Sequence, residues 1–168
     1  MKQQKVRKTT IRWAVENLIK KRGQIAGHKV VDFIYTLKSA AGYSRDDVED
    51  ATEIVLEKLM AEGTLHFTIR NAKLLRLTAE PKKADHQSVD NAETQRLEKA
   101  IITFSRSHSI ECENLTPLIA FLHDGQDDYK FGDDYELLCH CLTHLVATAT
   151  LCLRIRPGQF MQIVSLQD

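Results

Sequence analysis

The chain has 168 residues, of which 43% are hydrophobic and 27% charged, and only seven Gly and three Pro, a composition typical of a helix-rich folded protein. No apolar run approaches the roughly 18 residues of a membrane-spanning helix, and no apolar segment follows the basic N-terminus, so membrane and secreted proteins are not expected. All four Cys lie in the second half without a disulfide pattern, which is typical of reduced thiols in a cytoplasmic protein.

The net charge of zero hides a division along the chain. Residues 1–83 carry 17 Lys and Arg against 10 Asp and Glu, a net charge of +7. Residues 84–168 carry 6 against 13, a net charge of −7. A basic half and an acidic half indicate different partners, and solubility alone is the alternative explanation.

The first helix is predicted from an apolar stripe at Ile11, Val15, Leu18 and Ile19, whose spacing places all four side chains on one face. Three cations follow this stripe, and then Gly23. Cations in the last turn and a glycine just after it are typical of a helix C-terminus.

Two more helices are predicted before residue 64. The second runs from about His28 to Ala41 and is ended by Gly42; the third begins after Ser44, whose side chain can cap it, and is ended by Gly63. The apolar positions that support them are Val31, Ile34, Tyr35 and Leu37, and then Val48, Thr52, Val55, Leu56 and Leu59.

A β-hairpin follows the third helix. Leu65, Phe67 and Ile69 alternate with polar residues over residues 64–70, which predicts a half-buried strand. Residues 71–73 form the turn, and residues 74–78 form the return strand. The same alternation places Arg70 on the solvent side of the hairpin.

The pattern recurs 86 residues later. Residues 48–78 align without a gap over residues 134–164, and Tyr43 aligns with Tyr129. The offset pairs Leu56, Leu59, Leu65, Phe67, Ile69 and Arg70 with Leu142, Leu145, Leu151, Leu153, Ile155 and Arg156. It also places His140 and Cys141 over Ile54 and Val55, which are predicted to be core. The second helix matches least well, because residues 115–123 are shorter and residues 124–134 are longer and acidic.

Three helices closed by a β-hairpin, as in residues 9–78, resemble the winged helix-turn-helix superfamily. The resemblance implies a mostly α fold with small β-hairpins (α+β), arranged as tandem winged-helix domains. A basic tail over residues 1–8 would precede domain 1 (9–78), a polar linker (79–93) and domain 2 (94–166). Winged helices bind DNA in many regulators and serve as protein-docking modules in other complexes, so the fold implies either function.

The third helix of DNA-binding winged helices usually enters the major groove, but here it has a net charge of −5 over residues 44–62. Because duplex DNA is a polyanion, this helix is expected to be repelled. Phosphate contacts are predicted instead on the tail, the end of the first helix and the hairpin. These residues are Lys2, Lys5, Arg7, Lys8, Arg12, Lys20, Lys21, Arg22, Arg70, Lys73 and Arg76. Simple solvation, or complementing the helix dipole at residues 20–22, is the alternative role.

The leading hypothesis is a non-enzymatic, cytoplasmic nucleic-acid-binding regulator or accessory factor, with duplex DNA as the expected ligand. Acidic domain 2 would mediate a homodimer or bind a protein partner. The alternative is a pure protein-docking adaptor, or an inhibitor of a nucleic-acid-processing complex, that uses the acidic third helices. The predicted protein-interaction residues are Asp46, Asp47, Asp50, Asp127, Asp128, Asp133 and Asp134.

Six residues in the second half are potential metal ligands: His108, Cys112, Cys139, His140, Cys141 and His144. Cys139 and Cys141 point apart on a helix, so both cannot readily bind one zinc ion. No phosphate loop, His-Glu-x-x-His motif or organised nucleophile is present. The sequence therefore predicts no metal, no cofactor and no catalytic site.

Overall fold

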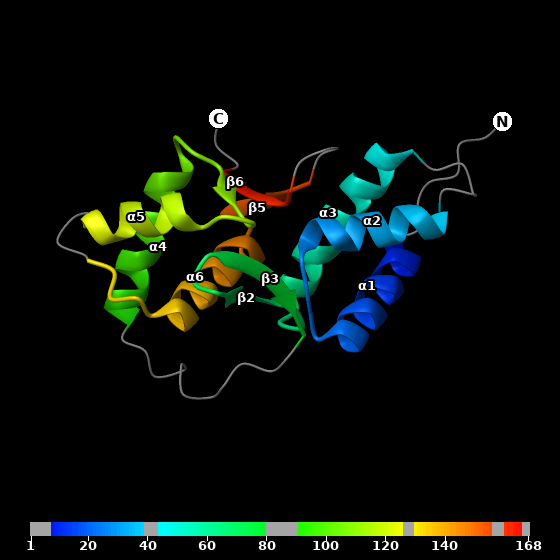
Figure 1. Ribbon diagram of the computed structural model, residues 1–168, viewed down its shortest axis with the longest axis horizontal. Coiled ribbons are helices and arrows are strands. Elements are labelled where there is room, and N and C mark those ends of the chain that lie inside the picture. The colour runs from blue at the N-terminus through cyan, green and yellow to red at the C-terminus, as the bar shows by residue number, and fades with distance from the viewer. Residues whose placement is uncertain (1–7, 39–43, 80–90, 126–129, 156–159, 166–168) are drawn as a thin grey trace.

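The computed structural model describes residues 8–38, 44–79, 91–125, 130–155 and 160–165. Over these residues the fold is mixed α and β, with six helices and two small three-stranded antiparallel sheets. Figure 1 shows the two halves side by side along the long axis of the molecule. α3, α6 and both hairpins lie at the centre, where the halves meet.

The first half comprises residues 8–79. Its elements in chain order are α1 (Lys8–Arg22), β1 (Gln24–Ile25), α2 (Gly27–Lys38), α3 (Arg45–Ala61), β2 (His66–Arg70) and β3 (Leu74–Thr78). The strands form a sheet in the order β1-β3-β2. The predicted helices and hairpin lie within a few residues of these elements, and the end of the predicted second helix, at Ala41 and Gly42, falls outside the described residues.

The second half comprises residues 91–165 and has the same order of elements. They are α4 (Asn91–Ser105), β4 (Ile110–Glu111), α5 (Thr116–Asp124), α6 (Tyr135–Ala147), β5 (Leu151–Arg154) and β6 (Gln162–Ser165). The sheet order β4-β6-β5 corresponds to that of the first half. The hairpin register also agrees, because Phe67 pairs with Leu77 and Leu153 pairs with Ile163, 86 residues later in both cases.

Local chemistry explains where the elements begin and turn. The Ser44 hydroxyl accepts a hydrogen bond from the backbone N–H of Asp47 at the start of α3, and the Asp134 carboxylate accepts one from Leu137 at the start of α6. In the β2–β3 turn, Asn71 and Ala72 have φ angles of 56° and 58°. Two successive left-handed residues give a turn whose twist matches that of the flanking strands.

Strands β1 and β4 were not predicted from the sequence, and one residue predicted to be core is half exposed. Each of these strands has only two residues, too few for an alternating pattern, and is recognisable only by its pairing with the return strand. Ile54, predicted to be core, is 46% exposed, whereas its neighbour Val55 is buried. A half-exposed isoleucine on an otherwise acidic helix face has no signature in the sequence.

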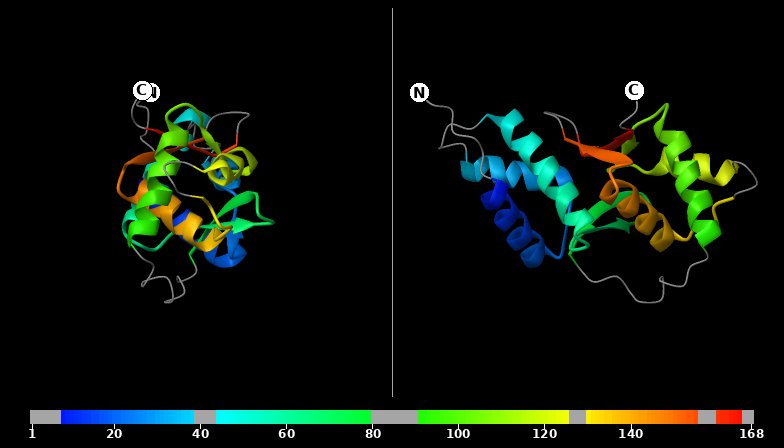
Figure 2. Two further views of the ribbon diagram at one scale, coloured as in Figure 1. Left: turned by 90° about the vertical axis from the view of Figure 1, so that its left-hand side faces the viewer. Right: turned by 180° about the vertical axis from the view of Figure 1, so that it is seen from behind.

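The third helices of the two halves pack against each other. α3 contacts α6, β2 contacts α6, and β5 contacts α3, so each hairpin reaches across to the opposite half. Figure 2 shows the same arrangement from behind, where α3 and α6 lie next to one another at the centre. Both helices carry buried residues along most of their length. One side of each third helix is therefore buried between the two halves.

Side chains of the third helices cap the free edges of the hairpins. The backbone N–H of Phe67 in β2 donates to the Thr143 hydroxyl of α6 at 2.9 Å. At the equivalent position of the second half, burial raises the pKa of Glu57 in α3 and the backbone of Leu153 in β5 lowers it, which places this carboxylate beside the strand. Both the strand residues and the helix residues of these two contacts are 86 positions apart, so the halves meet through related surfaces.

The capping on β5 continues one step further along the strand. The backbone N–H of Ile155 donates to the Glu53 carboxylate at 3.1 Å. Four residues of helix and two residues of strand both span about 6 to 7 Å, so Glu53 and Glu57 are in register with alternate backbone N–H groups of β5. Satisfied edges cannot recruit a further strand.

A second contact between the halves lies at the outer side of β3. Leu75 N–H donates to the Cys112 carbonyl at 2.7 Å, and Leu115 N–H donates to the Lys73 carbonyl at 2.8 Å. At Gly27, the first residue of α2, an added Cβ would lie 2.1 Å from the Met161 sulfur. Backbone hydrogen bonds and close packing thus join the halves on two sides.

Candidate nucleic-acid interface

The end of α1 presents the most compact set of exposed cations among the predicted phosphate contacts. Lys20, Lys21 and Arg22 occupy the last turn of the helix, and all three side chains are exposed. The partial negative charge of a helix C-terminus stabilises cations there, but it does not neutralise three of them. This basic turn, residues 20–22, is the first component of the candidate interface.

Arg12, also predicted to contact phosphate, is engaged within the protein. Its guanidinium lies 2.9 Å from the Glu16 carboxylate and 2.7 Å from the Glu62 carboxylate. Hydrogen bonds to Glu62 and then Glu16 raise the pKa of Arg12, and the pKa of Glu62 is lowered in return. Arg12 is therefore shared between two carboxylates, and the three side chains together carry a net charge of −1 beside α1.

The three cations of the hairpin that were predicted to contact phosphate have different surroundings. Arg70 and Lys73 are exposed at the turn between β2 and β3. The side chain of Arg76 is only 18% exposed, and its guanidinium lies 2.6 Å from the carboxylate of Glu113 in the second half. A second hydrogen bond of 3.4 Å makes this pair bidentate. Arg76 thus serves the contact between the halves.

The two exposed basic sets lie at opposite ends of β3. Gln24, just after the basic turn, pairs with Thr78, whereas Arg70 pairs with Leu74. Five strand residues separate these ends by about 13 Å. Lys2, Lys5 and Arg7 lie outside the described residues, as does the side chain of Lys8. Among the described residues, the predicted contacts thus form two separate basic sites.

Sequence reasoning did not single out Trp13, which is 67% exposed on α1. Trp13, Asn17 and Lys20 are spaced at i, i+4 and i+7 and lie opposite the buried stripe of Ile11 and Val15. The signal was available, because an aromatic residue out of phase with an apolar stripe must face solvent. The outer face of α1, opposite the buried stripe, therefore carries an aromatic ring. This ring lies on the same side of the helix as Lys20 in the basic turn.

The acidic residues predicted to bind a protein partner have different surroundings. Asp46, Asp47 and Asp50 are exposed on the first turns of α3, on the same side as exposed Ile54. Asp133 lies 2.6 Å from the Nε2 atom of His123. Asp134 caps α6, which gives it a structural role, and Asp127 and Asp128 lie outside the described residues.

The residues considered as metal ligands are dispersed. Cys112, Cys139 and Cys141 are buried, and burial raises the pKa of the Cys112 thiol. His108 stacks on Phe104, and the Nδ1 atom of His144 lies 2.7 Å from Glu98. Within the described residues, no group of three or more His, Cys, Asp or Glu side chains is arranged to hold a metal ion.

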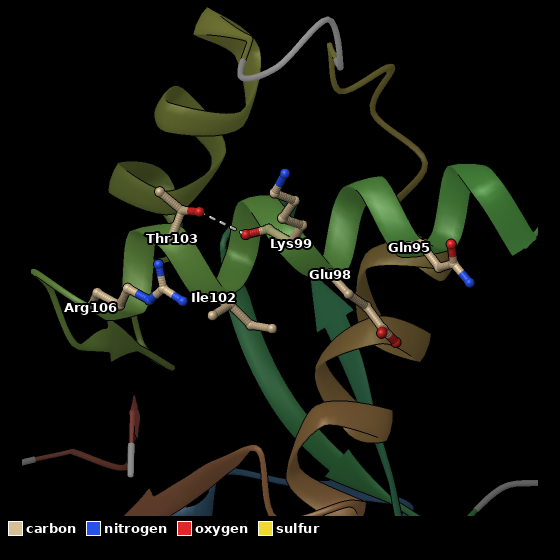
Figure 3. A pocket seen from close by; sticks show the side chains of 6 residues that line it. All are labelled: Gln95, Glu98, Lys99, Ile102, Thr103 and Arg106. Atoms are coloured by element: carbon tan, nitrogen blue, oxygen red, sulfur yellow. Dashed lines mark hydrogen bonds between the residues drawn. The ribbon is translucent and has the colours of Figure 1, made fainter. Parts of the chain in front are cut away.

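A shallow pocket of about 250 Å³ lies on the outer face of α4 (Figure 3). Its described lining residues belong to this one helix and to the residue that follows it: Gln95, Glu98, Lys99, Ile102, Thr103 and Arg106. A binding site for a small molecule is usually enclosed by several elements. This pocket is therefore not a typical small-molecule site. Its exposed cations, Lys99 and Arg106, are useful as a control for the cations of α1.

His28 lies where α2 meets the second half. Its side chain is 14% exposed, and its Nδ1 atom is 3.7 Å from the Glu113 carboxylate that also binds Arg76. The edge of the imidazole meets Phe160 with ring centroids 4.6 Å apart. The imidazole is thus enclosed at the contact between the halves.

The contact at His28 is expected to weaken in acid. Burial lowers the pKa of His28, with a further contribution from Lys29 and Arg76, while Glu113 and Asp32 oppose the shift. Because the unfolded chain has a higher histidine pKa, near 6.5, it binds the proton first as pH falls. Stability is therefore present above about pH 6.5 and is lost toward pH 5, by at most about 1.4 kcal/mol per pH unit.

This pH effect is measured by guanidinium unfolding at pH 7.5 and pH 5 for the wild type and His28→Gln. The variant is expected to lose less stability over this range than the wild type. Replacing exposed His108 by Gln is the matched control and is expected to leave the difference unchanged. Equal pH dependence in the wild type and His28→Gln would contradict the assignment.

No protein family, curated protein or solved structure was found that matches the chain. In the part of the chain that the structure describes, no helix is long and apolar enough to cross a membrane.

Proposed function

We propose that this protein is a non-enzymatic, cytoplasmic nucleic-acid-binding accessory factor with two winged-helix units. The element order and the sheet orders β1-β3-β2 and β4-β6-β5 support the winged-helix assignment. The observation that carries the binding proposal is the exposed basic turn at residues 20–22, whose three positive charges exceed the net charge of −1 on the group of Arg12, Glu16 and Glu62. Arg70 and Lys73 supply a second phosphate contact.

The packing of the third helices supports a binding mode with little sequence preference. α3 and α6 contact each other, and α3 has a net negative charge, so neither helix is suited to read bases in the major groove. Contacts from a helix end and a hairpin turn to phosphates carry no sequence information. The expected binding is therefore electrostatic and strongly dependent on salt.

Replacing Lys20, Lys21 and Arg22 together by Gln is expected to weaken binding and reduce its dependence on salt. Each phosphate contact contributes about 0.7 to 0.9 to the slope of log K against log salt, so the slope should flatten by about 2 to 3. Fluorescence anisotropy with labelled duplex and single-stranded oligonucleotides at several salt concentrations measures this directly.

The matched control replaces three exposed cations on and just after α4, Arg96, Lys99 and Arg106, by Gln. This variant has the same net charge as the first but is expected to keep the wild-type salt slope. Equal losses in both variants would show a general effect of charge. Absence of binding to either oligonucleotide at low salt would reject the proposed function.

A protein-docking adaptor is the second candidate. The observation that favours it is the exposed face of α3, where Asp46, Asp47 and Asp50 stand beside half-exposed Ile54. An acidic face with an apolar centre fits a basic protein partner. Co-purification from the native cell, with and without nuclease, separates the two functions, because a directly docked partner survives nuclease treatment.

A further inference from the structure

We propose that the outer face of α1 binds unpaired nucleic acid, with Trp13 stacking on a base while the basic turn at residues 20–22 contacts the adjoining phosphates. This inference rests on the proposed function and deepens it, because it names single strands as the preferred ligand and assigns the base contact to one residue.

The geometry of α1 aligns the two components. Trp13 and Lys20 lie on the same exposed side of the helix, opposite the buried stripe, and Lys21 and Arg22 follow directly. Seven residues of helix separate Trp13 from Lys20 by about 10 Å. At about 3.4 Å per stacked nucleotide, this distance corresponds to roughly three nucleotides of one strand.

The electrostatic surroundings of Trp13 are set by one group of ion pairs and by the basic turn. Glu16, the acidic residue on this face, is paired with Arg12, which also pairs with Glu62, so these three side chains together carry a net charge of −1. Asn17, one turn from Trp13 on the same face, is uncharged, and its amide donates to the Trp13 carbonyl at 2.8 Å. A strand lying along this face thus meets an uncharged amide and a paired carboxylate near the ring, and the three positive charges of residues 20–22 beyond it.

The chemistry of an exposed indole separates an unpaired strand from other ligands. Every unpaired base offers a π face to an aromatic ring, whereas the bases of a duplex are already stacked on their neighbours. A membrane surface would require an apolar stripe, but Glu16, Asn17 and Lys20 flank Trp13 on this face. A protein hot spot is typically ringed by further contacts that exclude water, and polar residues occupy those positions here.

Trp13 is the sole tryptophan of the chain, so its fluorescence reports on this face alone. Titration of the full-length protein with a thymidine oligonucleotide of about 15 nucleotides is expected to quench the emission. A duplex of the same length is expected to bind more weakly and to quench less. Binding of the single strand without quenching would overturn the role of Trp13 while leaving the proposed function intact.

Replacing Trp13 by Ala is expected to weaken binding of the labelled thymidine oligonucleotide by about 5- to 150-fold, the range measured for loss of one base–aromatic stack. Trp13→Phe should retain most of the affinity, and Phe33→Ala, which removes another exposed aromatic side chain, should retain all of it. Because Trp13 is largely exposed, circular dichroism and the thermal midpoint of the variant are expected to match the wild type.

The remaining outcomes also decide between explanations. Unchanged oligonucleotide affinity in Trp13→Ala, together with loss of a co-purifying protein, would show that this face docks a protein and would overturn the inference. Equal affinity for duplex and single strand, equally reduced in the Lys20, Lys21 and Arg22 variant, would leave phosphate binding standing and reject stacking. Failure of every oligonucleotide to bind at low salt would reject the inference and the proposed function together.

Discussion

Removing the side-chain acceptors that cap the hairpin edges is expected to lower the free energy of unfolding by about 2 to 5 kcal/mol. Thr143 and Glu53 each accept a hydrogen bond from a buried backbone N–H, of Phe67 and Ile155 respectively. In the combined variant Thr143→Val and Glu53→Leu, both N–H groups lose these acceptors without gaining water. Each buried, unsatisfied donor costs about 1 to 3 kcal/mol.

Guanidinium unfolding followed by circular dichroism measures this loss. The matched control is Thr143→Ser and Glu53→Gln, which keeps an acceptor at both positions and is expected to cost much less. Because the two hydrogen bonds lie on different hairpins, the single losses should be nearly additive. If the Val and Leu variant were as stable as the control, the edge strands would not depend on these side chains, and the contact between α3 and α6 would rest on apolar packing alone.

Arg76→Ala is expected to destabilise the fold by about 2 kcal/mol and to leave nucleic-acid affinity nearly unchanged. Arg76 and Glu113 form a bidentate pair whose side chains are 18% and 23% exposed. Loss of one partner leaves the other charge partly buried, and full burial would cost about 3 to 5 kcal/mol. Residual solvent screening reduces this cost.

A double-mutant cycle with Glu113→Ala tests the pair. Removing both side chains should cost less than the sum of the two single losses, with a coupling energy of about 1 to 2 kcal/mol. Arg70→Ala is the control, because Arg70 is exposed on the same hairpin and should weaken nucleic-acid binding without a comparable loss of stability. Reduced affinity and unchanged stability in Arg76→Ala would return this residue to the phosphate-binding set.

The first-half helices and the β2–β3 hairpin could be predicted because local sequence determines them. The apolar stripe at Ile11 and Val15, the cap at Ser44 and the alternation through Phe67 each specify a conformation within a few residues. The 86-residue offset likewise aligned the two hairpins, and in the structure they share one register, in which Phe67 pairs with Leu77 as Leu153 does with Ile163. Wherever one side of a helix or strand is buried, its apolar residues recur with the period of that element, and this pattern can be read from the sequence.

The roles of individual charged residues could not be predicted in the same way. Arg70 and Arg76 are both cations on one hairpin, yet only Arg76 meets a carboxylate, because Glu113 is brought to it by the packing of the second half. Glu53 and Glu57 count toward the net negative charge that the sequence gives the third helix. In the structure both carboxylates lie against the backbone of the second hairpin, because α3 packs against β5. Ion pairs and caps between distant segments depend on partners that sequence spacing does not specify.

The sequence by itself determined most of the local elements of this protein, the division into a basic and an acidic half, and the net negative charge of α3. Those properties follow from periodicity and charge, which are read over a few residues or summed over many. Only the tertiary structure decided that α3 and α6 cap each other's hairpins, and that Arg12 and Arg76 are engaged internally. Such facts depend on which surfaces meet, and many sequences with the same pattern could have met differently.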